Sequence, residues 1–312
     1  MRRARQSGVA AITAVLIVAV AASAVALMLA QQSATLDQAM MVASRAQADE
    51  YAQAGLDWAR GVIAADDPGV DSLADGWAQP MVGLPVDRAI VSGEITDEQG
   101  KFNLNNLVVG DKVSPDDVAI FRRLLASLGL PPELSDAVVD WIDSNDTPTG
   151  AAGAEDAWYL ALPQPYRTAD QPMVQVEELY RVRGFDPATV AKLRPYVTAL
   201  VVPGVRTTIN ANTASAVVLE AVLPDVPPAA IDRMVAQRVA NPFRSGEQLS
   251  RWALGVDAKA DTSALGVASS FFSVQVRVTQ DDIQLATDAL IQRGAAAGQT
   301  SGATLLWRRP RY

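Results

Sequence analysis

The sequence contains no cysteine and no histidine. Without cysteine, the chain cannot form a disulfide, a thiolate metal site or a cysteine nucleophile. Without histidine, it lacks the usual general base near neutral pH and the commonest zinc ligand, so a Ser-His-Asp triad is excluded. The patterns G-x-S-x-G, G-x-x-x-x-G-K-[ST] and G-x-G-x-x-G are also missing. Catalysis by carboxylates alone, as in a glycosidase, stays open but has no support beyond one acidic loop. We therefore expect a protein that is not an enzyme.

Positive charge is scarce as well. The chain has 26 Lys and Arg against 35 Asp and Glu, which gives a net charge of −9. Three of the positive charges, Arg2, Arg3 and Arg5, lie before Gly8, so removal of residues 1–8 as a leader lowers the net charge to −12. An acidic body of this kind repels nucleic acid and anionic lipid head groups at long range. We therefore expect no nucleic-acid partner.

A long uncharged segment follows these arginines. Val9 to Ala30 spans about 33 Å as a helix, enough to cross a hydrocarbon core of about 30 Å. The arginines place the N-terminus in the cytoplasm and the rest of the chain outside. A cleaved secretory signal peptide is the alternative, but the apolar run is too long for one, and helical spacing continues through Arg60. The positions that can form one apolar stripe in this continuation are Val42, Ala46, Ala54 and Trp58.

A short basic leader that ends in Gly8, followed by a long apolar helix, resembles the type IV prepilin family. The resemblance implies a prepilin peptidase that cuts after Gly8 and a mature, methylated N-terminus at Val9. Thr13 is then the fifth residue, where most members have a glutamate that neutralises the N-terminal amine of a neighbouring subunit. The protein K family of minor pseudopilins typically lacks this glutamate. Thr13 therefore favours a tip subunit, which has no subunit above it.

The next recognisable segment is a predicted β-hairpin. Strands are expected at 90–95 and 101–107, joined by Asp97-Glu98-Gln99-Gly100 with the glycine in a left-handed conformation. The string DEQGKFNLNNL over 97–107 closely resembles a hallmark of the protein K family of type II secretion. A polar hairpin without further meaning is the alternative.

Strand-like alternation returns near residue 270. Strands are predicted at 272–278 and 283–291, separated by a turn near Asp281, and at 304–308. A sheet that begins near residue 89, stops, and resumes near residue 270 indicates one domain with another inserted into it.

The segment between these strands is predicted to be mainly helical from residue 114 to residue 254. Three helix–turn–helix units have proline near the start of the second helix, where its missing N–H costs little. The units span 124–143, 179–198 and 219–238. They resemble helix-hairpin-helix modules, which often bind nucleic-acid backbones. Such binding needs a glycine-rich turn and nearby Lys or Arg, whereas segment 206–251 is close to neutral, so we favour a packing role.

An acidic loop follows the first unit. Its carboxylates and amide lie within 17 residues with no Lys or Arg among them: Asp140, Asp143, Asn145, Asp146, Glu155 and Asp156. A hard cation such as Ca²⁺, which takes about six to eight oxygens, relieves the repulsion between such carboxylates. The loop is not an EF-hand, because Pro148 stands at the glycine position, and a solvated loop is the alternative. The loop resembles the motif D-W-I-D-x-D-D…G-A-E-D…Y of the protein K family, which implies a structural Ca²⁺ site. Asn145 stands where the family commonly has Asp.

These features predict an α+β protein with a pseudopilin fold, in which a long N-terminal helix packs on an antiparallel sheet. A large helical domain of helix-hairpin-helix-like units is inserted into it. The expected divisions are a leader at 1–8, a transmembrane and assembly helix at 9–30, a pseudopilin α/β domain at 31–110 and 256–312, and the inserted domain at 111–255.

The resemblance implies a minor pseudopilin of the type II secretion system, in the bacterial inner membrane with its bulk in the periplasm. It would cap the tip of the pseudopilus, initiate assembly and support export of folded proteins across the outer membrane. The implied partners are minor pseudopilins of the I and J types, the prepilin peptidase and the inner membrane, and the outer-membrane secretin and secreted substrates are further candidates. The alternative is a membrane-anchored helix-hairpin-helix binding module of a type IV pilus or DNA-uptake system.

Overall fold

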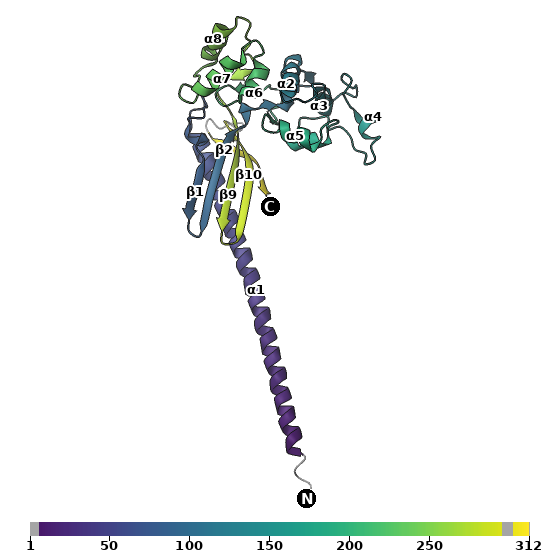
Figure 1. The fold of residues 1–312 in the computed structure, drawn as a ribbon, viewed down its shortest axis with the longest axis vertical. Helices are drawn as coiled ribbons and strands as arrows, with labels where there is room; N and C mark the ends of the chain where they lie inside the picture. The colour runs from purple at the N-terminus through teal and green to yellow at the C-terminus, as the bar shows by residue number, and fades with distance from the viewer. Residues whose placement is uncertain (1–5, 295–301, 312) are drawn as a thin grey trace.

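The computed structural model describes residues 6–294 and 302–311. Its most prominent element is α1 (Gln6–Ala65), a helix of 60 residues that projects far beyond the rest of the chain (Figure 1). At 1.5 Å per residue, α1 is about 90 Å long. Its residues 9–43 are exposed throughout, and the part after residue 43 packs against a sheet. The predicted helix through Arg60 is confirmed.

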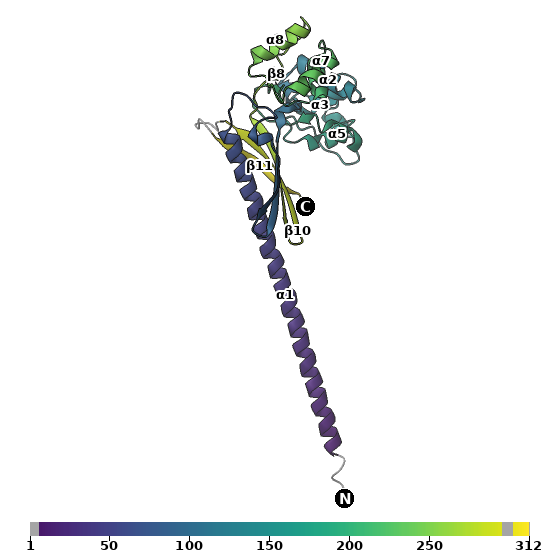
Figure 2. The same ribbon diagram turned by 60° about the vertical axis from the view of Figure 1, so that its left-hand side comes forward.

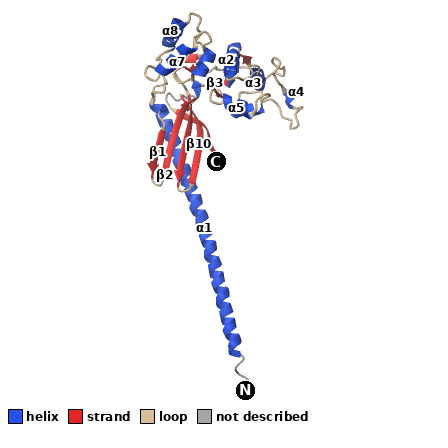
Figure 3. Cartoon of the chain, viewed as in Figure 1, coloured by secondary structure: helices blue, strands red, loops and turns tan. Residues whose placement is uncertain are grey.

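Five antiparallel strands form that sheet in the order β1-β2-β9-β10-β11. The strands are drawn in red in Figure 3. Their bounds are β1 (Met81–Val86), β2 (Ala89–Asp97), β9 (Phe271–Gln280), β10 (Ile283–Arg293) and β11 (Ala303–Arg311). The pairing of Ala89 with Gln280 joins segments that are distant in the sequence. The three strands predicted after residue 270 and the turn near Asp281 are confirmed.

The face of α1 that covers the sheet consists of small and aliphatic residues at helical spacing: Ala48, Ala52, Leu56, Ala59 and Ile63. The predicted apolar stripe does not face the sheet, because Val42 and Trp58 are 70% and 46% exposed and the two alanines between them are also exposed. The short distance between α1 and β9 explains why this face of α1 covers the sheet. A Cβ on Gly55 would lie 2.9 Å from Cγ1 of Val276 in β9, so the helix turns its smallest residues to the sheet.

A second unit, mainly helical, lies at the end of the sheet opposite to the projecting part of α1 (Figure 2). Its helices are α2 (Pro115–Ser127), α3 (Leu134–Ile142), α4 (Asp156–Tyr159), α5 (Pro187–Leu193), α6 (Ala216–Val222), α7 (Pro228–Gln237) and α8 (Gly246–Val256). Short strands tie its loops together: β3 (Phe102–Asn103), β4 (Val108–Val109), β5 (Lys112–Val113), β6 (Val197–Thr198), β7 (Ile209–Asn210) and β8 (Leu265–Gly266). The chain also has 3-10 helices η1 (Gly76–Ala78), η2 (Glu98–Gly100), η3 (Leu104–Leu107) and η4 (Val176–Arg181).

The predicted helical pairs are confirmed as α2 with α3 and as α6 with α7. In the middle pair, the first member is the 3-10 helix η4. One apolar core runs through this unit from Phe102 to Val267, separate from the core between α1 and the sheet. The exact domain boundaries stay a prediction.

The predicted hairpin was wrong. Strand β2 pairs with β1 and β9, whereas β3 leaves the sheet and pairs in parallel with β6. The asparagines of this segment explain the difference, because their amides are buried and donate to distant carbonyls. The donor–acceptor distances are 3.0 Å from Asn103 to Leu200 O, 2.8 Å from Asn105 to Met173 O and 2.8 Å from Asn106 to Thr207 O.

Gly100 serves close packing rather than a left-handed turn. Its φ is not positive, and a Cβ there would lie 2.8 Å from Thr213 Oγ1. The neighbouring Asp97 joins the two units. Its Oδ2 accepts hydrogen bonds from Ser269 Oγ (2.6 Å), Thr213 Oγ1 (2.6 Å) and Asn210 Nδ2 (3.0 Å). The pKa of Asp97 is raised by its complete burial, against the lowering effect of these bonds.

Candidate functional site

The acidic loop connects the end of α3 to the start of α4. Asp140 lies in the last turn of α3, Asp143 is its C-cap, and Glu155 directly precedes α4. All three side chains are buried. The fold thus brings together the central members of the predicted metal site from two helix ends.

Several oxygens in this group have no hydrogen-bond partner. Within the described part of the chain, both carboxyl oxygens of Glu155 and Oδ2 of Asp143 are buried and unpaired. The pKa of Glu155 is raised to about 8, first by burial and then by repulsion from Asp140, Asp143, Asp170 and Asp146. Buried oxygens that face other carboxylates fit a hard cation better than they fit one another.

The loop closes tightly over these carboxylates. The Thr149 N–H donates to Oδ1 of Asp140 at 2.9 Å. Gly150 has φ +59, and a Cβ there would lie 2.2 Å from Oδ2 of Asp136. A Cβ on Gly153 would lie 2.3 Å from Oδ2 of Asp140. Only glycine fits at both positions, so the loop is shaped around the carboxylates, and the residues present fit a Ca²⁺ ion.

The other predicted ligands have different surroundings. Asn145 is exposed, and its Oδ1 accepts the Thr147 N–H at 2.8 Å, as in a turn. Asp156 pairs with Arg167 and accepts the Thr168 N–H at 3.1 Å. Asp146 is exposed, and it acts on Glu155 through its charge. The ligand role of all six residues stays a prediction.

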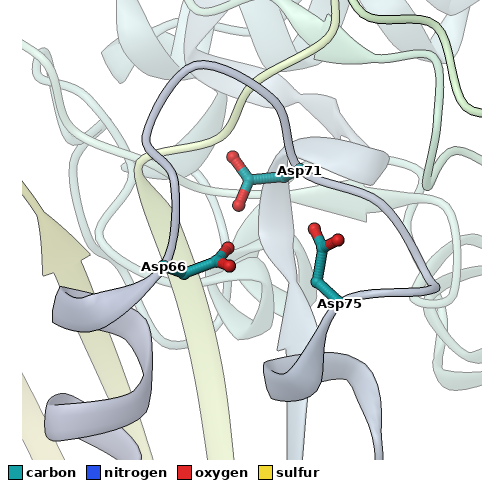
Figure 4. Close-up of side chains that lie close together, drawn as sticks. All are labelled: Asp66, Asp71 and Asp75. Atoms are coloured by element: carbon teal, nitrogen blue, oxygen red, sulfur yellow. The ribbon is translucent and has the colours of Figure 1, made fainter.

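Sequence reasoning missed two features. Asp170 raises the pKa values of Asp143 and Glu155, but it lies beyond the dense acidic segment and close to Arg167. A separate carboxylate cluster of Asp66, Asp71 and Asp75 could hold a metal ion (Figure 4). Its only signal in the sequence is three aspartates spread over ten residues, with Asp67 among them.

The assembly helix carries the other predicted site residues. Gly8 and Val9 lie within α1, while Arg2, Arg3 and Arg5 fall outside the described residues. By length and composition, α1 is a candidate to cross a membrane once. Oγ1 of Thr13 donates within its own helix, to Val9 O at 3.1 Å and Ala10 O at 3.0 Å. The hydroxyl of Thr13 is therefore satisfied without a partner subunit.

Arginines near the helical pairs have partners within the chain. Arg206 pairs with buried Asp117 at 2.7 Å, and Arg122 pairs with Asp136 at 2.7 Å. Arg238 is buried and donates to the carbonyls of Ala211 and Ala214. These arginines support the packing of the helical unit, which weakens the case for a helix-hairpin-helix nucleic-acid module.

Comparisons with known proteins agree across most of the chain. Two family profiles described as "Type II secretion system (T2SS), protein K" match residues 100–203 and 209–268. Type II secretion system protein K of Pseudomonas aeruginosa is 35% identical over 312 residues, covering 94% of this chain and 90% of that protein. The protein of the same name from Pectobacterium carotovorum subsp. carotovorum is 34% identical, covering 90% of each.

A solved structure shares the fold. A chain in the crystal structure of the GspK-GspI-GspJ complex from the type 2 secretion system of enterotoxigenic Escherichia coli matches with a TM-score of 0.72. The match covers 86% of this chain and 97% of that chain at 24% identity. The α+β pseudopilin architecture is thereby shown.

Proposed function

Because the chain belongs to the type II secretion system protein K family, we propose that it caps the tip of the periplasmic pseudopilus as a minor pseudopilin. In this proposal α1 anchors the chain in the inner membrane, with the sheet and the helical unit in the periplasm. Capping would initiate assembly of the pseudopilus and support export of folded proteins across the outer membrane.

The observation that carries the tip position is the placement of the helical unit. It lies beyond the sheet at the end opposite to the projecting part of α1 (Figures 1 and 2). A further subunit stacked above would collide with this mass. Thr13 agrees with the same position, because it provides no charge for the N-terminal amine of a subunit above it.

The partners we propose are minor pseudopilins of the I and J types. The related chain from enterotoxigenic Escherichia coli was crystallised with GspI and GspJ. On this chain, the exposed stripe of α1 formed by Val42, Ala46, Ala54 and Trp58 is the surface we assign to partner helices. Exposed Leu36, Met40 and Met41 extend apolar surface along α1 toward the membrane.

The experiment is co-expression of the full chain with I-type and J-type pseudopilins and the prepilin peptidase. A stoichiometric complex whose K-type subunit begins at Val9 is expected. The variant Gly8→Ala should keep its leader, and Gly61→Ala, which meets nothing within 4 Å, is the matched control in the same helix. A mature Gly8→Ala protein that still begins at Val9, or separate elution of the three proteins, would contradict the proposal.

We further propose a structural Ca²⁺ ion in the acidic loop, held by Asp140, Asp143 and Glu155 with help from Asp146, Asn145 or Asp170. Ca²⁺ would supply the positive charge that these buried oxygens lack, and it would fix the loop between α3 and α4. This part of the helical unit is also a candidate surface for contact with the secretin or with secreted proteins.

A further inference from the structure

A second group of carboxylates lies where α1 ends. Asp66 is the first residue after the helix, Asp71 lies in the following loop, and Asp75 precedes η1. One oxygen from each of the three lies within 4.8 Å of the others. Figure 4 shows the three side chains pointing toward one another from the two ends and the middle of the loop.

Asp71 provides an independent sign of a missing ligand. Its side chain is 0% exposed, and its Oδ1 has no hydrogen-bond partner among residues 6–294 and 302–311. Its Oδ2 is fully engaged, because it accepts the Ser269 N–H at 2.7 Å and pairs with Arg293. A buried carboxylate oxygen without a donor costs free energy unless a cation or a water satisfies it.

The charges around this loop do not balance. Arg293 pairs with Asp71 and, at 3.3 Å, with Asp66. Among the described residues, Asp75 accepts hydrogen bonds from Ser72 alone, through the backbone N–H at 2.7 Å and Oγ at 3.0 Å. Three carboxylates against one guanidinium leave two negative charges around a loop in which Asp71 is buried and the other two are partly exposed. In agreement, burial raises the pKa of Asp71 to about 6, and burial followed by repulsion from Asp75 raises the pKa of Asp66.

We propose that Asp66, Asp71 and Asp75 bind a Ca²⁺ ion. The available ligands are oxygens only, which selects a hard cation, and a divalent ion matches the two uncompensated charges. Ca²⁺ tolerates irregular coordination, whereas Mg²⁺ demands a near-octahedral shell that three side chains from one irregular loop do not prearrange. Asp66 and Asp75 are partly exposed, so the ion can enter from solvent.

The site lies where α1 ends and the chain contacts the helical unit. The Asp71 N–H donates to Val267 O at 2.8 Å, and Asn210 Nδ2 donates to Asp71 O at 3.2 Å. Asp71 is therefore hydrogen-bonded to the helical unit, whereas Asp66 directly follows the last residue of α1. An ion between them would tie the assembly helix directly to the unit that it carries. This inference is independent of the acidic loop between α3 and α4.

The test counts bound calcium on the full chain in detergent, by equilibrium dialysis with radioactive Ca²⁺ after chelation. The double variant Asp143→Asn/Glu155→Gln removes the acidic-loop site, and we expect it still to bind one ion. Adding Asp66→Asn/Asp75→Asn should abolish that ion, while adding Asp67→Asn, a neighbouring exposed aspartate, should leave it. The Asp71–Arg293 pair stays intact in all of these variants.

Hydrogen exchange on the unmodified chain provides a readout that no substitution can disturb. Ca²⁺ should slow amide exchange in residues 66–75, and Mg²⁺ at the same concentration should not. The proposal is overturned if the acidic-loop variant binds no calcium, or if adding Asp66→Asn/Asp75→Asn leaves the number of bound ions unchanged. It is also overturned if amide exchange in residues 66–75 does not change with Ca²⁺ or changes equally with Mg²⁺.

Discussion

Asp97, at the end of β2, is a buried carboxylate that accepts hydrogen bonds from uncharged groups of Asn210 and Thr213 in the helical unit and of Ser269. Its pKa is raised from 3.8 by burial. Above pH 3.8 the unfolded chain releases a proton that the folded chain still holds, so the free energy of unfolding falls as pH rises toward the folded pKa. Since an amide does not titrate there, Asp97→Asn should flatten this decline.

Chemical denaturation of the full chain at a series of pH values measures this effect. Glu50→Gln, an exposed change of the same kind on α1, should reproduce the wild-type profile. Parallel pH profiles for the wild type and Asp97→Asn would show that Asp97 does not titrate within the folded chain in this range.

Glu155 tests the acidic loop. Without metal at neutral pH, Glu155→Gln should raise the melting temperature, because the raised pKa makes Glu155 take up a proton on folding, and glutamine removes that cost. In the wild type, EDTA should lower the melting temperature and Ca²⁺ should restore it. The variant should show a smaller calcium response, whereas exposed Glu133→Gln should keep the full one. Equal responses in all three proteins would argue against a ligand role for Glu155.

At the scale of an element, the face of α1 that covers the sheet depends on Gly55. Replacing glycine with alanine within a helix normally stabilises by about 0.5–1 kcal/mol. Here the new methyl group meets Val276 at 2.9 Å, and overpacking costs about 1–3 kcal/mol. Gly55→Ala should therefore destabilise the fold, and Gly61→Ala, with open space around it, should stabilise it.

Thermal unfolding of the full chain in detergent measures both changes. In a Val276→Ala background the obstruction is gone, so Gly55→Ala should become stabilising there. A Gly55→Ala effect that keeps its sign and size in that background would rule out contact with Val276 as the cause.

The elements that sequence reasoning predicted correctly are those with a strong period. β9 alternates buried and exposed residues over its length, and α1 is long, apolar and uninterrupted by proline. The apolar stripe on α1 did not identify the face that packs on the sheet, because close packing on β9 favours alanine and glycine over a residue as large as Trp58. The hairpin was wrong because partners for Asn103, Asn105 and Asn106 lie about 70 to 100 residues away. The pattern of neighbouring residues in the sequence does not indicate hydrogen-bond partners at such a distance along the chain.

For the candidate sites as well, sequence reasoning found what is local in the sequence and missed what depends on distant residues. The acidic loop was visible because its carboxylates are dense in the sequence. Asp170 and the cluster of Asp66, Asp71 and Asp75 were not, since the first lies on a later loop and the second depends on Arg293 and Ser269, about 200 residues downstream.

For the whole molecule, assembly should depend on the exposed stripe of α1. Trp58 is 46% exposed in the isolated chain, so Trp58→Ala should weaken the complex with the I-type and J-type pseudopilins without lowering the melting temperature of the chain. Val82→Ala, a truncation at an 82% exposed position on strand β1, should leave the complex intact. Size-exclusion chromatography of the co-expressed proteins measures the amount of complex. If Trp58→Ala leaves that amount unchanged, Trp58 does not contribute to the interface.

The central pairing of β2 with β9 also sets an order of events during biosynthesis. The ribosome makes α1 and β2 well before β9, β10 and β11. Until they arrive, the alanine-lined side of α1 has nothing to cover it, and the helical unit has time to fold on its own contacts first. Closure of the sheet should be slow, because it joins strands separated by about 180 residues. A nascent chain halted before Phe271 should therefore leave the alanine-lined side of α1 without its cover and open to proteases and chaperones.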